Sequence, residues 1–200
     1  MQKIKGNFNY IDSRRKSQLF KSILAFGICL SIFLLGLALN NNSKNNIFTI
    51  FAVLGVLPST KILISYILLI PYHSVSKELY EKVKPNVPEN VVFYTDVVFT
   101  SEERSMMLDF VAIDRHFLIG YRQPRMKKKD VIEEKKNKEK LTQIYDYLKT
   151  QLELRKINYQ VEMYDDLDRY LNRISKLSLE EEQKTEDYKE VTEYFWSLMV

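Results

Sequence analysis

From Ser22 to Leu39 the chain reads SILAFGICLSIFLLGLAL, a stretch without a charged side chain. A helix that crosses the hydrocarbon core of a bilayer needs about 20 predominantly apolar residues, and this stretch is close to that length. A second apolar stretch, Ile47 to Tyr72, follows after the polar linker NNNSKNN. Because the linker is short, we expect an α-helical transmembrane hairpin with antiparallel spans of about 22–39 and 47–72.

Basic residues are distributed unevenly around this hairpin. The linker holds only Lys44, whereas the residues on the other side are Lys3, Lys5, Arg14, Arg15, Lys16 and Lys21 before the first span and Lys77, Lys82 and Lys84 after the second. Cytoplasmic flanks carry the excess of lysine and arginine, so we expect both termini in the cytoplasm and the protein in the cell membrane. Residues 1–72 hold eight basic residues and one acid, and residues 73–200 have a net charge of −3. The basic excess therefore belongs to the membrane part, and nucleic acid is not an expected partner.

Two features inside the apolar stretches are candidates for contacts within the bilayer. Gly27 and Ser31 form a small-xxx-small pair that lets helices approach closely, either within the hairpin or in a homo-oligomer. Pro58 removes a backbone donor from the second span, and Lys61 places a charge near its middle. A lipid or partner contact would explain Lys61, and so would a lysine that snorkels to the inner interface.

The remaining chain, residues 73–200, is expected to form one cytoplasmic domain that folds without the membrane. The predicted strands are 91–100, 106–113, 116–122 and 157–164, and the first three form an antiparallel meander. The predicted helices are 74–83, a long helix within 126–152, one capped by Asp165 or Asp166, and a last one opened by the capping box of Ser178 and Glu181. The order α-β-β-β-α-β-α-α indicates an α+β or α/β domain after the transmembrane hairpin.

Several kinds of site have no support in the sequence. The single cysteine, Cys29, excludes a disulfide within the chain. His73 and His116 belong to no triad pattern, and no glycine-rich loop that binds phosphate is present, so no cofactor is expected. Asp166 and Asp168 spell D-x-D, a pattern that can hold a metal and a sugar nucleotide, but acids at a helix start are better explained by the helix dipole.

One region of the sequence has a pattern known from a protein family. Residues 108–113 read LDFVAI and, after a tight turn, residues 117–122 read FLIGYR. This pattern resembles the NERD-type branch of the PD-(D/E)xK nuclease-like fold, which reads roughly IDHVVI, a turn and FVIETK. The resemblance covers residues 74–164, and the order helix, three strands, helix, strand also matches that fold. It places Asp109 on the family's first metal-binding aspartate.

The chain departs from that family at the positions that cleavage requires. Gly120 stands where the second carboxylate would be, and Arg122 stands where the lysine would be. Such nucleases need two acids to hold Mg²⁺ and activate water. The resemblance therefore implies a degenerate, non-cleaving relative, while a purely structural role on a strand remains open for Asp109.

A second acidic arrangement is conceivable across the first hairpin of strands. The candidate catalytic residues are Asp96, Glu102, Glu103 and Asp109, with Asp109 as the candidate metal ligand. Carboxylates held close together would attract a metal ion. The alternative for Glu102 and Glu103 is a solvated hairpin tip.

Three functions follow from these observations. The sequence favours a membrane-anchored interaction or regulatory module without catalysis, whose partners are the lipid bilayer and an unidentified protein. The alternatives are a metal-dependent nuclease or other hydrolase of PD-(D/E)xK-like fold, and a lipid-sensing module on the membrane surface. The last rests on the stretch Arg122 to Lys140, which has a net charge of +5. No enzymatic activity is settled by the sequence.

Overall fold

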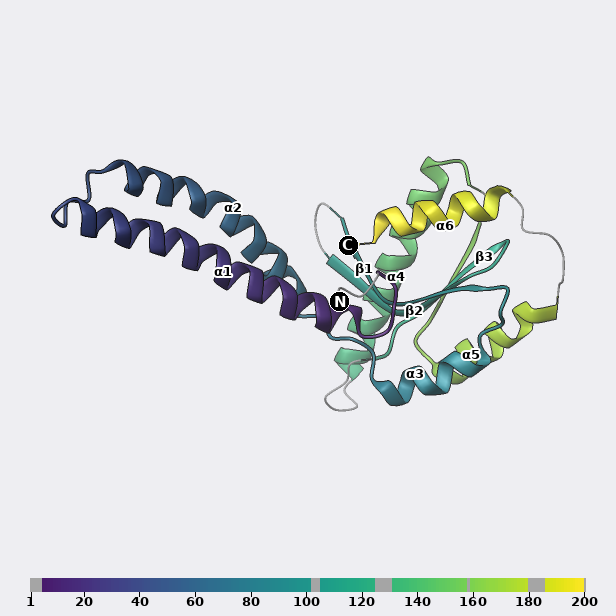
Figure 1. Ribbon diagram of the computed structural model, residues 1–200. Helices are drawn as coiled ribbons and strands as arrows, with labels where there is room; N and C mark the ends of the chain where they lie inside the picture. Colours follow the sequence, from purple (N-terminus) through teal and green to yellow (C-terminus); the bar gives the residue numbers. More distant parts are fainter. Residues whose placement is uncertain (1–4, 102–104, 125–130, 158, 180–185, 200) are drawn as a thin grey trace. The chain divides into compact units, whose positions relative to one another are not determined.

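The computed structural model describes residues 5–101, 105–124, 131–157, 159–179 and 186–199 (Figure 1). Two compact units make up the chain. One holds residues 11–73, and the other combines residues 5–10 with the chain from Ser74 onward. The sequence predicts a single boundary, between residues 72 and 73. In the structure, the short segment before the hairpin also belongs to the second unit. The hairpin is therefore an insertion between two parts of one domain.

The first unit is a pair of helices, α1 (Tyr10–Leu39) and α2 (Ile47–Leu69). Both are long and apolar enough to cross a membrane, judged by length and composition. Helix α1 begins twelve residues before the expected span, because residues 10–21 contain neither proline nor glycine and continue the helix through a charged segment. Helix α2 starts at the cap Asn46, whose Oδ1 accepts a hydrogen bond from the Thr49 N–H at 2.9 Å.

Glycines bring the two helices into close contact. A Cβ on Gly36 would lie 2.5 Å from the Cβ of Phe48, and one on Gly55 would lie 2.8 Å from the Sγ of Cys29. Gly27, in contrast, has nothing within 4 Å of such a Cβ, and the exposed Ser31 hydroxyl donates to the Gly27 carbonyl at 2.8 Å. The pair Gly27 and Ser31 therefore does not pack against α2, and its role in a homo-oligomer stays a prediction.

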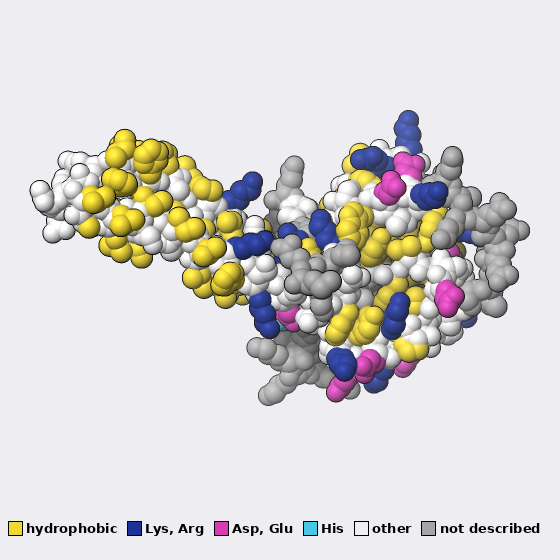
Figure 2. Space-filling model, viewed as in Figure 1, with side chains coloured by type: hydrophobic (Ala, Val, Ile, Leu, Met, Phe, Trp, Pro, Cys, Tyr) yellow, Lys and Arg dark blue, Asp and Glu magenta, His cyan; other side chains and the backbone are white. Residues whose placement is uncertain are grey.

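The hairpin exposes most of its large hydrophobic side chains. Leu57 is 71% exposed and Leu39 is 70% exposed. Among the described residues, the exposed large hydrophobic side chains outside residues 19–70 are only Leu154 and Trp196. Figure 2 shows the hydrophobic side chains of the hairpin in yellow. A continuous apolar surface of this size is typical of a contact with lipid or with another protein.

The second unit is built on a four-stranded sheet in the order β1-β2-β3-β4. Its strands are β1 (Val92–Thr100), β2 (Ser105–Ile113), β3 (Phe117–Tyr121) and β4 (Gln160–Tyr164). The first three are antiparallel, so the predicted meander is confirmed. Strand β4 is parallel to β3, because helix α4 (Val131–Leu154) crosses over between them.

Helices cover both faces of the sheet and give the domain three layers (Figure 1). Helices α4 and α6 (Glu186–Leu198) cover one face, where Ile144, Leu148, Val191 and Phe195 pack against Val97, Phe99 and Leu108. Helices α3 (Lys77–Val83) and α5 (Leu167–Ser175) cover the other, where Leu79, Val83, Tyr170 and Ile174 pack against Phe110 and Ala112. The predicted fold class is confirmed.

The starts of the helices agree with the sequence in part. Asp166 is the N-cap of α5, and its Oδ1 accepts from the Arg169 N–H at 2.9 Å. Short 3-10 turns follow α3 at Lys84–Asn86 and α5 at Lys176–Leu179. Ser178 lies in the second turn, and Glu181 lies outside the described residues, so the predicted capping box is not observed as a pair.

Candidate functional site

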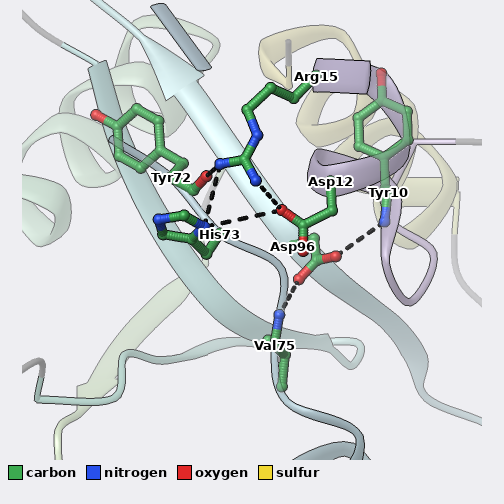
Figure 3. Close-up of polar contacts among 7 residues, drawn as sticks. All are labelled: Tyr10, Asp12, Arg15, Tyr72, His73, Val75 and Asp96. Carbon is green, nitrogen blue, oxygen red and sulfur yellow. Dashed lines mark hydrogen bonds and ion pairs between the residues drawn. The ribbon is translucent and has the colours of Figure 1, made fainter. Parts of the chain in front are cut away.

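The side chain of Asp96 joins the two segments that lead into and out of the hairpin. It is 1% exposed, and its two carboxylate oxygens have separate partners. Oδ2 accepts from the Tyr10 N–H at 2.9 Å, and Oδ1 accepts from the Val75 N–H at 2.8 Å (Figure 3). Tyr10 is the first residue of α1, and Val75 follows α2. We call this arrangement the Asp96 clasp.

Strand β1 changes its side-chain alternation at the clasp. Tyr94 and Val97 belong to the same core although they are three residues apart, whereas regular alternation would put them on opposite faces. Asp96 lies between them with φ of 54°, in the left-handed region that aspartate tolerates better than most residues. This backbone conformation turns the Asp96 carboxylate away from the regular pattern of the strand and toward the two N–H groups.

Strand β2 changes its alternation at the same level. Leu108 and Val111 also share one core across a three-residue step. The strands keep one register on both sides of this point, so Asp109 stands opposite Asp96. Asp109 is 4% exposed, and its Oδ2 accepts from the Gln123 N–H at 2.6 Å. Both buried acids thus hold backbone N–H groups of segments outside the sheet.

The segment before the hairpin is bound along β1. The Gly6 carbonyl accepts from the Thr95 N–H at 2.7 Å and from the Thr95 hydroxyl at 3.3 Å. Gly6 has φ of 75°, and a Cβ at this position would run into the ring of Tyr94. Only glycine combines this conformation with so close an approach.

Further contacts fix the ends of this segment. The Lys5 ammonium donates to the Met199 carbonyl at 2.9 Å. The Phe8 ring stacks on Tyr80 of α3 with 4.6 Å between ring centroids. Residues 5–10 therefore contact elements on both sides of the sheet and form part of the folded domain.

Within the first unit, Arg15 connects the start of α1 with the end of α2. Its Nη2 lies 3.0 Å from Asp12 Oδ1, and its Nη1 donates to the Tyr72 carbonyl at 3.2 Å (Figure 3). Nη1 also lies 3.1 Å from Nδ1 of His73. Arg15 thus contacts Asp12, Tyr72 and His73 at the base of the hairpin.

Two of the four residues in the predicted acidic cluster, Asp96 and Asp109, lie in the described part of the chain. Asp96 and Asp109 are neighbours across the strands, but each carboxylate binds backbone N–H groups. Glu102 and Glu103 lie outside the described residues. In the part of the chain that the structure describes, no three histidine, cysteine or acidic side chains gather at a distance that could hold a metal ion.

The side chains of Met163 and Leu108 lie where the second carboxylate of the nuclease pattern would begin. A Cβ on Gly120 would lie 2.5 Å from Sδ of Met163 and 3.0 Å from Cδ1 of Leu108, both in the core beneath α4 and α6. The Arg122 N–H, at the end of β3, donates to the Tyr164 carbonyl at 3.0 Å. A second acid at this position would therefore have to displace the side chains of Met163 and Leu108.

The end of β3 nevertheless has an acidic environment. Burial, followed by the charges of Asp109, Asp166 and Asp165 in that order, raises the pKa of Tyr121 to about 12. Asp166 is also the N-cap of α5, so its carboxylate has the structural role that the sequence favours over a D-x-D metal site. A phenol with so high a pKa stays protonated at neutral pH and can donate a hydrogen bond but cannot act as a base.

The structure also places the two membrane residues predicted from the sequence. Helix α2 continues without interruption through Pro58. Ser59 is buried, with its hydroxyl 3.7 Å from Sγ of Cys29 on α1. Lys61 is two residues further on, about 200° around the helix, so it points away from α1, and its side chain is exposed. It makes no ion pair with any described residue.

Comparison with known proteins gives no match: no protein-family model fits the chain, and neither a curated protein nor a solved structure is significantly similar to it.

Proposed function

We propose that the chain is a membrane-anchored interaction or regulatory module without catalytic activity, with its domain and both termini in the cytoplasm. The Asp96 clasp carries this proposal. One buried carboxylate holds the first residue of α1 and the segment after α2, so the sheet is connected to both ends of the apolar hairpin.

The same contacts support a hairpin whose ends lie on one side of the membrane. Residues 5–10 belong to the same compact unit as the chain from Ser74 onward. Such packing requires the two flanks of the hairpin to share one compartment. The basic residues of these flanks make the cytoplasm that compartment.

The geometry of the clasp supports a regulatory role. A ligand or bilayer change that shifts α1 against α2 would change the separation of the Tyr10 and Val75 N–H groups, which Asp96 binds at the same time. The clasp would respond by losing at least one bond. A partner that prefers one of these two arrangements of the domain would thereby sense the hairpin.

In this proposal the domain has a PD-(D/E)xK-like fold and does not cleave nucleic acid. The element order and the mixed sheet support it. Gly120 argues against cleavage, because its position is filled by Met163 and Leu108. The lipid-sensing alternative rests on Arg122 to Lys140, of which residues 125–130 lie outside the described part, and within α4 Lys138 pairs with Glu134 at 2.8 Å.

Cysteine accessibility tests the topology. In a Cys29→Ser background, Asn45→Cys in the linker and Lys189→Cys in α6 are exposed to a membrane-impermeant maleimide. We expect labelling of Asn45→Cys in intact cells and labelling of Lys189→Cys only after permeabilisation. The reverse pattern contradicts the proposed orientation, and equal labelling of both in intact cells contradicts a spanning hairpin.

A further inference from the structure

The first three turns of α1 carry charge that the rest of the hairpin does not balance. Residues 10–21 contain Arg14, Arg15, Lys16 and Lys21 against the single acid Asp12, a net charge of +3. The segment that lies beside this charge in the first unit, residues 70–73 after α2, contains no acid. The opposite end of the hairpin has only Lys44 among asparagines.

Part of this charge is already used within the unit. Arg15 lies 3.0 Å from Asp12 and donates to the Tyr72 carbonyl, so it closes the base of the hairpin. Lys16 and Lys21 differ from Arg15 in this respect. Both are exposed, and neither makes a hydrogen bond or an ion pair with any described residue. Their ammonium groups are therefore accessible to a ligand outside the chain.

Helical geometry distributes the basic residues of this segment over two sides of α1. Arg14 and Lys21 are seven residues apart and lie on one side of α1, whereas Lys16 lies on another side. We call Arg14, Lys16 and Lys21 the basic collar. Leu19 and Phe20, within the collar, are 38% and 69% exposed. Apolar and basic side chains interleaved where a helix leaves an apolar span are typical of the level of the lipid headgroups.

On the basis of the proposed membrane anchoring, we infer that the basic collar binds the headgroups of anionic phospholipids in the leaflet that faces the domain. Charge complementarity identifies this occupant. Two lysines that lack an internal partner are held by a rigid helix beside the bilayer surface, where anionic lipids supply phosphate groups at high local concentration. Figure 2 shows Lys and Arg side chains, in dark blue, at the end of the hairpin away from its turn.

Lipid selectivity of the full-length chain tests this inference. The protein is reconstituted into phosphatidylcholine vesicles that contain a trace of spin-labelled phosphatidylglycerol or spin-labelled phosphatidylcholine. Electron paramagnetic resonance gives the fraction of each labelled lipid that the protein immobilises, and the ratio gives the preference for the anionic lipid. We expect the wild-type chain to prefer phosphatidylglycerol.

The double variant Lys16→Gln/Lys21→Gln is expected to lower this preference, by at most about fivefold per lysine. Lys44→Gln is the control for position, because it removes one lysine charge at the other end of the hairpin, and it should leave the preference of the collar leaflet intact. Raising the salt from 0.1 to 1 M shortens the Debye length from about 10 Å to about 3 Å and should weaken the wild-type preference.

Two results would overturn the collar: an equal preference in the wild type and the double variant, or an equal loss in the double variant and in Lys44→Gln. Alkaline carbonate extraction of the wild type separates this failure from failure of the proposed function. A chain that carbonate releases from the membrane contradicts the anchoring itself, whereas an embedded chain without lipid preference contradicts only the collar.

Discussion

The side chain of Asp96 binds the two chain segments that flank the hairpin. Asp96→Gly preserves the backbone conformation at φ of 54° and removes both hydrogen bonds. Because the two N–H groups are left without their acceptor, we expect the free energy of unfolding to fall by about 2–3 kcal/mol. Asp96→Asn, which tolerates the same φ but retains only one acceptor, should lose about 1 kcal/mol.

Hydrogen exchange of the full-length protein measures this effect at the site. Peptides that cover residues 5–10 and 74–79 should exchange faster in Asp96→Gly. Asp146→Asn, which changes an exposed acid of α4, is the control and should stay within about 0.5 kcal/mol of the wild type. Unchanged protection of both peptides in Asp96→Gly would show that the clasp is not what holds them.

Gly120 gives a second prediction at the scale of single residues. Gly120→Glu restores the acid of the nuclease pattern, but its side chain would enter the space of Met163 and Leu108. We expect it to destabilise the domain by about 3 kcal/mol or more and to confer no cleavage of DNA or RNA with Mg²⁺ or Mn²⁺. Metal-dependent cleavage by the wild type that disappears in Asp109→Ala would establish the hydrolase alternative.

Residue types alone explain why the sequence could identify these acids but not their roles. Asp96 and Asp109 stand out in the sequence because each interrupts an apolar run. Their partners, however, are backbone N–H groups of Tyr10, Val75 and Gln123, and every residue except proline carries such a group. No pattern of side chains distinguishes these three positions, so the sequence could not reveal these hydrogen bonds.

At the scale of elements, one ion pair connects strand β4 to helix α5. Arg173 donates from Nε to Glu162 Oε2 at 2.9 Å and from Nη2 to Oε1 at 3.0 Å, and the Tyr164 hydroxyl donates to Glu162 Oε2 at 2.8 Å. Burial raises the pKa of Glu162, but the hydrogen bonds from Arg173 and Tyr164 and the charge of Arg173 outweigh burial. The pKa of this carboxyl is therefore below its ordinary value of 4.5.

The sign of the pH dependence follows from this depressed pKa. The folded state binds the proton of Glu162 more weakly than the unfolded state does. The pair therefore stabilises the domain fully above about pH 4.5, and this contribution is lost as the pH falls through the folded pKa. Glu162→Gln should cost about 1 kcal/mol at pH 7 and less at pH 3, as measured by urea unfolding. Glu153→Gln, whose exposed pair with Lys149 spans 4.0 Å, should cost little at either pH.

Elements were predicted well where periodicity or composition identifies them. The four strands, the meander, the cap at Asp166 and the two apolar helices were expected from the sequence and are present. The extension of α1 to Tyr10 was not expected, because the hydropathy signal that marks a span ends at Ser22 while the helix itself does not. The docking of residues 5–10 was not expected either, since only Phe8 and Tyr10 alternate with polar residues in KGNFNY, which is too short a pattern to predict a strand.

At the scale of the whole molecule, the domain consists of two chain segments separated by the hairpin. From the sequence, residues 73–200 are expected to fold without the membrane. Removing residues 5–10 deletes the contacts of Gly6 with Thr95, of Phe8 with Tyr80 and of Tyr10 with Asp96. A fragment of residues 74–200 should therefore be less stable than one in which a short Gly-Ser linker joins residues 1–10 directly to Ser74.

Both fragments lack the hairpin, so their thermal transitions compare the docked segment alone. We expect the linked form to melt at a higher temperature, by about 4–8 °C for each kcal/mol that the segment contributes. The linker can be short because the Tyr10 and Val75 N–H groups bind the same carboxylate. In the linked form, Gly6→Ala should abolish most of this gain. Equal melting of the two fragments would show that residues 5–10 do not stabilise the domain.

The insertion of the hairpin within the domain has a consequence for biosynthesis. A ribosome releases residues 5–10 first and the sheet much later, so the two parts can meet only after both apolar helices have been made. If the second helix failed to re-enter the bilayer, residues 5–10 and the sheet would end in different compartments. Asp96 would then be left without Tyr10, and β1 without Gly6. Completion of the domain thus depends on insertion of both helices in the proposed topology. A chain with the wrong topology would expose β1 without residues 5–10 to quality-control proteases.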